Sequence, residues 1–539
     1  MYILGINGGV RAGYQDVSSV LIKDGKVVFA LAEERINRKK HSSGQLPYYG
    51  IKAALDFAKI NIKDVDYVAT HGSTWGKSYE NVLEEYLKYS FGHAPKIMRV
   101  HHHVCHAASA YYGSGFKEAM VLTMDASGDG VAVQKAIGKA GKIKVLKQES
   151  RTNSLGIFYS IMTQFCGFTR DTDEYKLMGL APYGDSSKVD LSEVLKLENN
   201  GYSFDNRFLK ELTPGAPQPS RQQAAYSEKL NALLGVSRLP GADMTDHYMN
   251  VAAATQETLK AVVIDLVTQL HKKTGLRKLC LAGGVALNCE INRFLMNLDF
   301  IDEIFVQPAS GDDGISLGAA WQASAELGVP PVPADNYYLG KAYSQDEVKA
   351  CLDLLNINYI SIDNPAETAA NLVAKDLVVA WYQGRDEFGP RALGARSIIA
   401  NPKHPGMKRL INQKIKFREG FRPFCPSVLE EDTALYFTGK QKISPYMTIN
   451  YTVKNPSLAP SISHVNKTAR IQTVNNSQNK LYWEYLNTLK KKIGVGMSIN
   501  TSFNRSNEPV IHSPKDAISA FYGSGIDAML IGDFLIKKD

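Results

Sequence analysis

Four histidines gather in one short stretch of the chain, RVHHHVCHAASAYYG, which begins at Arg99. His102 and His106 stand four positions apart, so both imidazoles point to one side if the stretch is helical. Two imidazoles on one helix face are a common ligand pair for a divalent metal. The same spacing also occurs among histidines that are hydrogen-bonded within a core, so further ligands are needed to decide. His101 and His103 need no role in either case.

Two aspartates follow apolar runs at the edge of glycine-rich loops, Asp125 in TMDASGDG and Asp312 in PASGDDG. Loops at the carboxyl ends of strands converge on one cleft in many α/β proteins. Two imidazoles and two carboxylates suit Fe(II), Mn(II) or Zn(II) and leave coordination positions open for phosphate oxygens. We therefore expect a divalent metal, Fe(II) first, bound by His102, His106, Asp125 and Asp312. The alternative is that each aspartate only closes an Asx-turn.

The elements that must position these residues repeat along the chain. Residues 2–33 read as an apolar strand, a glycine-rich loop, a second strand, a tight turn and a third strand, and residues 120–149 repeat this order. Segments with helical periodicity, 51–60 and 81–91, alternate with short apolar runs, which is typical of an α/β protein. The repetition predicts a duplicated domain that binds phosphate in the cleft between its halves.

Two further junctions of strand, glycine-rich loop and helix follow, KLCLAGGVALNCEINRFL and IFVQPASGDDGISLGAAWQA. A helix that begins after such a loop offers unpaired backbone N–H groups and a positive dipole end to a phosphate. Prolines then accumulate in ELGVPPVPADNYYLG and the pattern resets. We place a domain boundary there, between a first domain of residues 1–337 and a second of residues 338–539.

The composition is that of an ordinary globular protein, with 539 residues, 44% hydrophobic and 22% charged, and a formal net charge of +8. No apolar stretch has the length of a membrane span and the first residues lack a signal-peptide pattern, so we expect a cytoplasmic protein without a membrane partner. The six cysteines are scattered and form no C-x-x-C pair, which argues against disulfides and zinc fingers. The basic balance allows an anionic substrate or a nucleic acid.

Seven motifs follow one another in a recognisable order: HHVCHAASA, SLGIFYS, DEYKLMGLAPYG, LAGGVALN, GRDEFGPRALGARSI, KFREGFRPFCPSVL and NTSFN. Together they resemble the O-carbamoyltransferases of antibiotic tailoring and nodulation-factor biosynthesis. The resemblance implies an α/β fold with a TsaD-like N-terminal domain of the duplicated actin, Hsp70 and sugar-kinase type. A YrdC-like α/β domain is expected to follow it.

The resemblance also implies a two-step reaction. In this family the C-terminal domain combines carbamoyl phosphate with ATP, bound with Mg(II), to give carbamoyl adenylate and pyrophosphate. The N-terminal domain then moves the carbamoyl group to an acceptor hydroxyl, which we expect on a sugar, a polysaccharide or a natural product. A hydroxymethylated base in DNA stays open because of lysine clusters such as residues 490–492. A nucleotide-dependent kinase or sensor is a further alternative, and the oligomeric state is open, with a homodimer as one option.

The site residues implied for the C-terminal domain are mostly cationic. The charges of carbamoyl phosphate and ATP require guanidinium and ammonium groups in fixed geometry. The K-x-R of YrdC-like domains falls on Lys416 and Arg418, and its S-x-N falls on Ser502 and Asn504. Three further arginines complete the expected carbamoyl phosphate and nucleotide site: Arg391, Arg422 and Arg470.

For the N-terminal domain, the H-x-x-x-H metal motif of the family falls on His102 and His106. The residues implied in nucleotide binding are Ser127, Gly128, Gly283, Gly284 and Asn288. The residues implied in catalysis are Asp16, Lys40, Arg391 and Arg418, with Lys39 as a competitor for the role of Lys40.

The first glycine-rich loop departs from the family pattern. Where many members carry a His-Asp pair, this sequence has Gln15 before Asp16. A glutamine cannot serve as a general base. Three acceptors for the proton of the acceptor hydroxyl stay open: Asp16, a metal-bound hydroxide and the leaving phosphate.

Overall fold

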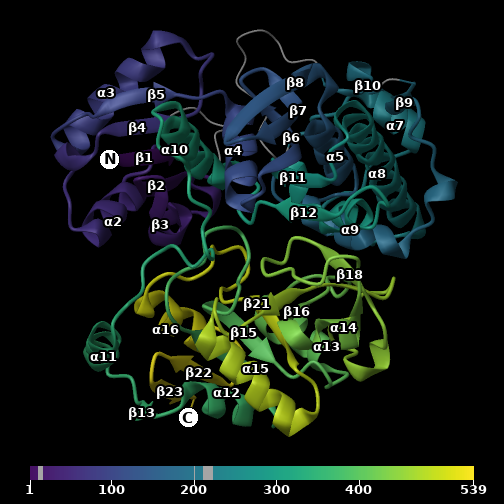
Figure 1. Ribbon diagram of the computed structural model, residues 1–539. Helices are drawn as coiled ribbons and strands as arrows, with labels where there is room; N and C mark the ends of the chain where they lie inside the picture. The colour runs from purple at the N-terminus through teal and green to yellow at the C-terminus, as the bar shows by residue number, and fades with distance from the viewer. Residues whose placement is uncertain (10–15, 200, 211–222, 539) are drawn as a thin grey trace.

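The computed structural model describes residues 1–9, 16–199, 201–210 and 223–538. Gln15 therefore lies outside the described residues. The N-terminal half forms two lobes side by side, and the C-terminal half lies beneath both of them in the view of Figure 1.

The first lobe is built on a five-stranded sheet with the order β3-β2-β1-β4-β5. β1 runs antiparallel to β2 and parallel to β4. Asp24 and Gly25 connect β2 to β3 with positive φ at both positions, which is the turn that the sequence KDGK predicts. The strands are β1 Tyr2–Asn7, β2 Ser18–Lys23, β3 Lys26–Ala32, β4 Tyr67–Thr70 and β5 Lys96–Arg99.

The second lobe repeats this topology in a sheet with the order β8-β7-β6-β11-β12. β6 runs antiparallel to β7 and parallel to β11, as β1 does to β2 and β4. The strands are β6 Glu118–Gly128, β7 Val131–Lys139, β8 Lys142–Ser150, β11 Lys278–Ala282 and β12 Glu303–Val306. The predicted duplication is confirmed.

Two helices lie between the sheets and pack against each other, α4 (His102–Ser114) and α10 (Ile315–Glu326). α10 follows the last strand of the second sheet but packs on β1, β2 and β4 of the first. Their contact surfaces are rich in buried alanine, which allows close approach. The outer faces of the sheets are covered by α2 Tyr49–Ala58 and α3 Gly76–Phe91 on the first, and by α5 Leu155–Phe165 and α8 Asp246–Thr274 on the second.

The C-terminal half contains an eight-stranded sheet with the order β13-β23-β22-β14-β15-β21-β16-β20. Helices α12 (Pro365–Val373) and α15 (Lys480–Ile493) pack on one face of it, around the buried Trp381. The strands are β13 Ile360–Ser361, β14 Val379–Tyr382, β15 Arg396–Ala400, β16 Cys425–Leu429, β20 Gln472–Val474, β21 Met497–Ser502, β22 Ala528–Ile531 and β23 Phe534–Lys537. A small sheet of β17 Phe437–Thr438, β18 Asn450–Val453 and β19 Thr468–Arg470 lies beside it.

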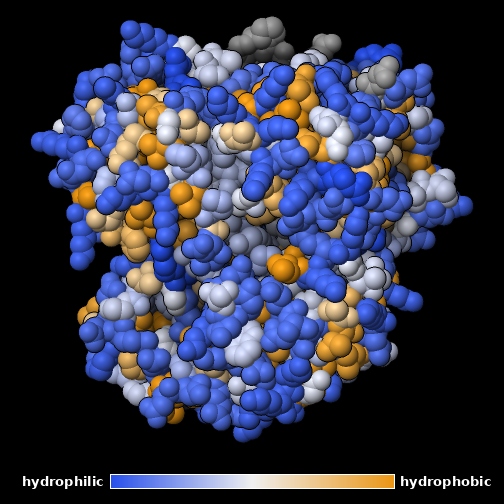
Figure 2. All heavy atoms as spheres, in the orientation of Figure 1, coloured by the Kyte–Doolittle hydropathy of each residue, from blue (hydrophilic) through white to orange (hydrophobic). Residues whose placement is uncertain are grey.

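The halves are connected by the chain between α10 and α11 (Gln345–Leu354), and the predicted boundary at residue 338 lies in this connection. All six cysteines are free thiols, as the scattered positions predict. None of the helices in the described part of the chain is both long and apolar enough to span a membrane. The face drawn in Figure 2 is mostly hydrophilic, with small scattered hydrophobic patches.

Candidate active sites in the two halves

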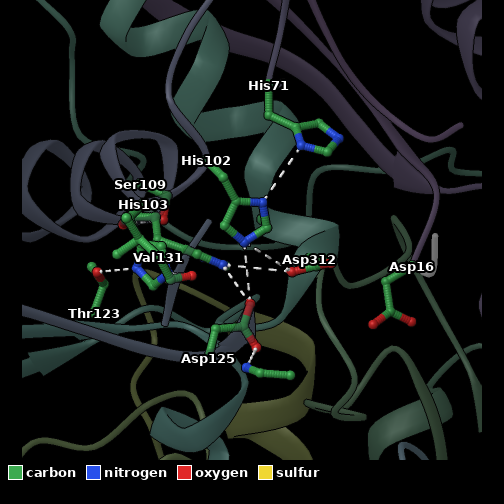
Figure 3. Close-up of polar contacts among 12 residues, drawn as sticks. Asp16, His71, His102, His103, Ser109, Thr123, Asp125, Val131 and Asp312 are labelled. Atoms are coloured by element: carbon green, nitrogen blue, oxygen red, sulfur yellow. Dashed lines mark hydrogen bonds and ion pairs between the residues drawn. The ribbon is translucent and has the colours of Figure 1, made fainter. Parts of the chain in front are cut away.

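The four residues of the predicted metal site lie together between the two lobes (Figure 3). One ligand atom from each lies within 4.8 Å of the other three. Nε2 of His102 and Nε2 of His106 are each 3.2 Å from Oδ2 of Asp125. The same two nitrogens are 3.7 and 3.5 Å from Oδ1 of Asp312. The residues that the spacing selected are thus brought to one place by three separate elements.

The local structure of each element explains the position of its ligand. α4 begins at His102, so His102 and His106 are one turn apart on the same side. Asp125 lies near the end of β6, and Asp312 begins the short 3-10 turn that leads into α10. Gly128 is required where β6 passes α4, because a Cβ there would lie 2.0 Å from Cγ of His102.

The donor set fits a divalent cation. Oδ1 of Asp312 is buried beside both imidazoles and has no hydrogen-bond partner among the described residues. Burial opposes a charge on His106, but its contacts with Asp125 and Asp312 outweigh burial and raise its pKa to about 9. Burial alone would raise the pKa of Asp125, yet the two imidazoles hold it well below its usual range. The cluster therefore favours a positive charge at its centre, and two nitrogens with two oxygens suit Fe(II), Mn(II) or Zn(II).

The other two histidines of the stretch have structural partners. Nδ1 of His103 is 2.7 Å from Oγ1 of Thr123, and its Nε2 is 3.0 Å from the carbonyl oxygen of Val131. The imidazole of His101 accepts the N–H of His103 and caps α4. Neither side chain belongs to the metal cluster.

A different histidine, His71, approaches the cluster from the end of β4. Its Nδ1 lies 3.5 Å from Nδ1 of His102 (Figure 3). When Nε2 of His102 binds a metal, its Nδ1 carries the proton and needs an acceptor, and the lone pair of His71 can serve. Burial and the neighbouring His102 lower the pKa of His71 to about 3, so it is a neutral acceptor. The sequence holds no spacing signal for this contact, which joins the residue after β4 to the first residue of α4.

Asp16 also has a partner that the sequence analysis missed, His41. Nδ1 of His41 is 2.6 Å from Oδ1 of Asp16, and the N–H of Asp16 donates to the carbonyl of His41. Both residues have positive φ, 54° and 64°, a strained conformation that this double contact maintains. Oδ2 of Asp16 lies beside Gly311, which precedes the metal ligand Asp312. Figure 3 shows Asp16 on the same side of the cluster as Asp312.

Lys40 and its competitor Lys39 are both exposed in the segment that precedes His41. Burial opposes a charge on His41, but the Asp16 carboxylate outweighs it and raises the pKa of the imidazole. Among the described residues, no side-chain hydrogen bond or ion pair distinguishes the two lysines, so the role of Lys40 stays a prediction.

The predicted nucleotide loops border the metal cluster. A Cβ on Gly284 would lie 3.0 Å from Oδ1 of Asp125. Gly283 has a φ of 90° and lies so close to the carbonyl oxygen of Met124 that a Cβ would be 2.2 Å from it. Ser127 and Gly128 end β6 on the same side. These four residues adjoin the metal site, and their role in nucleotide binding stays a prediction.

Asn288 is already engaged by the protein itself. Its Oδ1 accepts the N–H of Ile291 and the amide of Gln256, and its Nδ2 donates to Oε1 of Gln256. It caps the N-terminus of α9 (Cys289–Met296). A nucleotide contact by Asn288 would have to replace one of these hydrogen bonds.

In the other half, a cavity brings together most of the predicted cationic residues. Its walls include Arg391, Arg418, Arg422, Arg470 and Ser502. Burial and the neighbouring Arg470 lower the pKa of Arg391 to about 10. Burial and the neighbouring Arg422 lower that of Arg418 to about 9. Crowded guanidinium groups of this kind are stabilised by an anionic ligand.

Lys416 and Asn504 lie behind the wall of this cavity. Nζ of Lys416 donates to the Ser502 carbonyl and to Oδ1 of Asn504, the latter at 2.8 Å. Burial, together with Arg418 and Arg422, lowers the pKa of Lys416 well below its usual range. Lys416 ends a π-helical turn, residues 412–416, that no sequence pattern indicates and that is common at functional sites. Its contacts assign it the positioning of Ser502.

Known protein families match segments in both halves of the chain. The models for carbamoyltransferase N-terminus and carbamoyltransferase C-terminus match residues 74–321 and 370–538. The nodulation protein NolNO of Sinorhizobium fredii is 34% identical over an alignment that covers 100% of this chain and 83% of that protein. The chain belongs to the carbamoyltransferase family. The 3'-hydroxymethylcephem-O-carbamoyltransferase of Amycolatopsis lactamdurans is 30% identical over 68% of this chain and 65% of its own length. This carbamoyltransferase is thus a transferase enzyme.

The N-terminal half of this carbamoyltransferase completes the cationic cavity. Tyr175 and Glu290 line it, and the guanidinium of Arg422 lies 4.6 Å from the ring of Tyr175. Glu290 Oε2 accepts the amide of Asn450, and Lys176 forms an ion pair of 3.1 Å with Glu419. The motif DEYKLMGLAPYG contains the tyrosine, but only the fold shows that it closes the other half's site.

The lysine cluster of residues 490–492 has a structural explanation in this carbamoyltransferase. The three lysines form the last turn of α15, where cations are favoured by the helix dipole. Lys490 also forms an ion pair of 2.8 Å with Asp432. The cluster therefore gives no support to nucleic-acid binding.

We expect His71→Ala to weaken metal binding about tenfold, because the proton on Nδ1 of His102 loses its acceptor. His71→Asn, which offers a carbonyl oxygen instead, is expected to restore part of the affinity. The measurement is a titration of each purified, metal-free variant with Zn(II) or Fe(II). His93→Ala, which removes an exposed histidine, is the control, and unchanged affinity of His71→Ala would contradict the expectation.

Proposed function

We propose that this enzyme is an ATP-dependent O-carbamoyltransferase that works in two steps, one in each half. The C-terminal domain, residues 338–539, forms carbamoyl adenylate from carbamoyl phosphate and ATP. The N-terminal domain, residues 1–337, transfers the carbamoyl group to an acceptor hydroxyl. The observation that carries the proposal is the pairing of an arginine-lined cavity in one half with a metal-ligand cluster in the other.

In the first step, bonds must break and form in a defined order. Pyrophosphate leaves only if an oxygen attacks the α-phosphorus of ATP, so carbamoyl phosphate must first lose phosphate to water and become carbamate. The carbamate oxygen then displaces pyrophosphate and becomes the bridging oxygen of carbamoyl adenylate. Four guanidinium groups around Ser502 can hold the phosphates of both substrates. Their repulsion in the absence of a ligand favours the binding of polyanions, with Mg(II) accompanying ATP.

For the second step, His102, His106, Asp125 and Asp312 would hold a divalent cation, for which we propose Fe(II). When bound, such a cation supplies a Lewis acid for phosphate and carbonyl oxygens. The Asp16 and His41 pair lies beside the same cluster and can accept the proton that the acceptor hydroxyl loses. His41 thus provides an imidazole beside Asp16, although Gln15 stands where many family members have a histidine.

The two sites are joined by a short piece of chain. Gly284 adjoins the metal ligand Asp125, and Cys289, five residues later, lines the cationic cavity. Five residues span at most about 18 Å even when fully extended. A carbamoyl adenylate formed in the cavity therefore has a short path to the metal cluster, which limits its hydrolysis.

We propose a small-molecule or sugar hydroxyl as the acceptor. The names of the relatives include nodulation proteins and an enzyme that acts on a hydroxymethylcephem. The test is incubation of the enzyme with ATP, carbamoyl phosphate and each of three acceptor classes, oligosaccharides, hydroxymethylated β-lactams and hydroxymethylated DNA, followed by mass spectrometry. A mass increase of one carbamoyl group, about 43 Da, in one of the first two classes supports the proposal. An increase in the DNA alone would replace it with the nucleic-acid alternative.

A further inference from the structure

A four-residue helix, α1 (Glu34–Asn37), lies directly before Lys40 and His41 and is fixed firmly in the N-terminal half. The buried carboxylate of Glu33 accepts the N–H groups of three successive residues, 48–50, at the start of α2. Oε2 of Glu34 accepts the N–H of His41 at 2.7 Å. Any movement of α1 therefore moves the imidazole that pairs with Asp16.

The first arginine of this segment, Arg35, crosses to the C-terminal half. Its Nη2 donates to the carbonyl oxygen of Gly389 at 2.7 Å, two residues before Arg391 of the cationic cavity. A Cβ on Gly389 would lie 2.9 Å from the carbonyl oxygen of Pro308, in the segment that leads to the metal ligand Asp312. Arg35 thus holds the point where the loops of the two sites touch.

The burial of Arg35 is costly. The side chain is 2% exposed, its Nε and Nη1 have no hydrogen-bond partner among the described residues, and its ion pair with Oε1 of Glu34 is long, at 4.0 Å. A buried guanidinium with unsatisfied donors destabilises the folded state. This weak compensation of a buried charge points to a role for Arg35 beyond fold stability.

The second arginine, Arg38, which is the C-cap residue of α1, binds the loop that follows β21, and Ser502 at the end of β21 lines the cavity. Its Nη1 and Nη2 donate to the carbonyl oxygens of Val510 and Pro509 at 2.7 and 2.9 Å. The preceding residue, Glu508, accepts the amide of Asn504 through its carbonyl oxygen at 2.6 Å. Arg38 is thereby linked through a few hydrogen bonds to the Ser502 and Asn504 pair.

We propose that Arg35 and Arg38 are positioning residues that couple the two sites, so that carbamoyl adenylate is retained inside the enzyme only while the two halves are held together. This inference rests on the proposed two-step reaction. α1 and its C-cap residue carry the two arginines, and Glu34 of the same helix fixes His41. One short segment therefore positions the loop of Arg391, the loop after Ser502 and the Asp16–His41 pair. Loss of both arginines leaves each site with its own residues but releases the loops from the transfer half, and the mixed anhydride escapes to water.

The test is pyrophosphate release in the presence of ATP and carbamoyl phosphate, without any acceptor. The wild-type enzyme is expected to release about one equivalent of pyrophosphate in a burst and then to slow down, because the retained adenylate blocks further turnover. In the Arg35→Ala/Arg38→Ala variant we expect the burst to remain and the steady rate to rise about tenfold, with free AMP and carbamate as products. Arg35→Lys/Arg38→Lys, which keeps a donor at each position, is expected to return the steady rate toward that of the wild type.

Arg385→Ala is the matched control. Arg385 also crosses the boundary, donating to the carbonyl oxygens of Val28 and Gly340 at 3.0 and 2.8 Å, but contacts neither site loop. It should lower the melting temperature without raising the steady rate. If the wild-type enzyme shows the burst but the double alanine variant has the same steady rate as the wild type, the coupling role is overturned and the two-step reaction stands. The absence of any burst in the wild type would overturn both.

Discussion

Replacing Arg418 with alanine is expected to reduce pyrophosphate release from ATP and carbamoyl phosphate by about 10²- to 10³-fold. Arg418 is held in the cavity by a hydrogen bond of 2.7 Å from Nε to Oδ1 of Asn412 and by packing on the ring of Phe424. Arg418 lines the cavity that we propose for the phosphates of ATP and carbamoyl phosphate, where negative charge accumulates. Alanine supplies no positive charge at this position. Ser502→Ala is expected to act in the same direction, because Ser502 joins the cavity to Lys416.

His106→Ala is the counterpart in the other half. It removes a metal ligand but touches no wall of the cationic cavity, so the initial burst of pyrophosphate release should stay close to that of the wild type while carbamoyl transfer to the acceptor stops. The pyrophosphate burst and the carbamoylated product are measured in the same reaction for each variant. Equal losses of the burst in Arg418→Ala and His106→Ala would contradict the division of the reaction between the halves.

The second large effect concerns the metal. The His102→Ala/His106→Ala variant is expected to lose nearly all of its bound divalent cation, because both nitrogen ligands disappear and the two remaining carboxylates form a weak site. The measurement is metal content by mass spectrometry after purification and after reconstitution with Fe(II), Mn(II) and Zn(II). His101→Ala, one residue away but outside the cluster, should retain the metal, and unchanged content in the double variant would refute the ligand assignment.

The parts of the molecule that follow from local pattern were predictable. The alternation of apolar strands with glycine-rich loops predicts both sheets, and the duplication predicts that the loops of Asp125 and Asp312 converge. The i, i+4 spacing of His102 and His106 then completes the cluster, since α4 begins where the motif does. Short-range periodicity and one topological rule predict that these four residues meet, and the family resemblance selected them as metal ligands.

The contacts that join distant segments were not predictable from local pattern. His41 reaches Asp16 only because the chain adopts positive φ at both, and positive φ at non-glycine residues has no reliable sequence signal. The wall that Tyr175 adds to the cavity depends on the docking of one half on the other. The same holds for Arg35, whose partner, Gly389, is 354 positions away. Motif reading identified the positions of Lys416 and Asn288, but only the structure shows that both side chains are engaged within the protein.

The most direct measurement of the central claim is the release of phosphate and pyrophosphate by the purified enzyme given ATP, Mg(II) and carbamoyl phosphate. We expect pyrophosphate release to require both substrates and to be accompanied by an equal amount of phosphate, as carbamoyl adenylate formation demands. Release of pyrophosphate from ATP alone at the same rate, or no release in any mixture, would contradict the assignment of the C-terminal half as a carbamoyl-adenylating site.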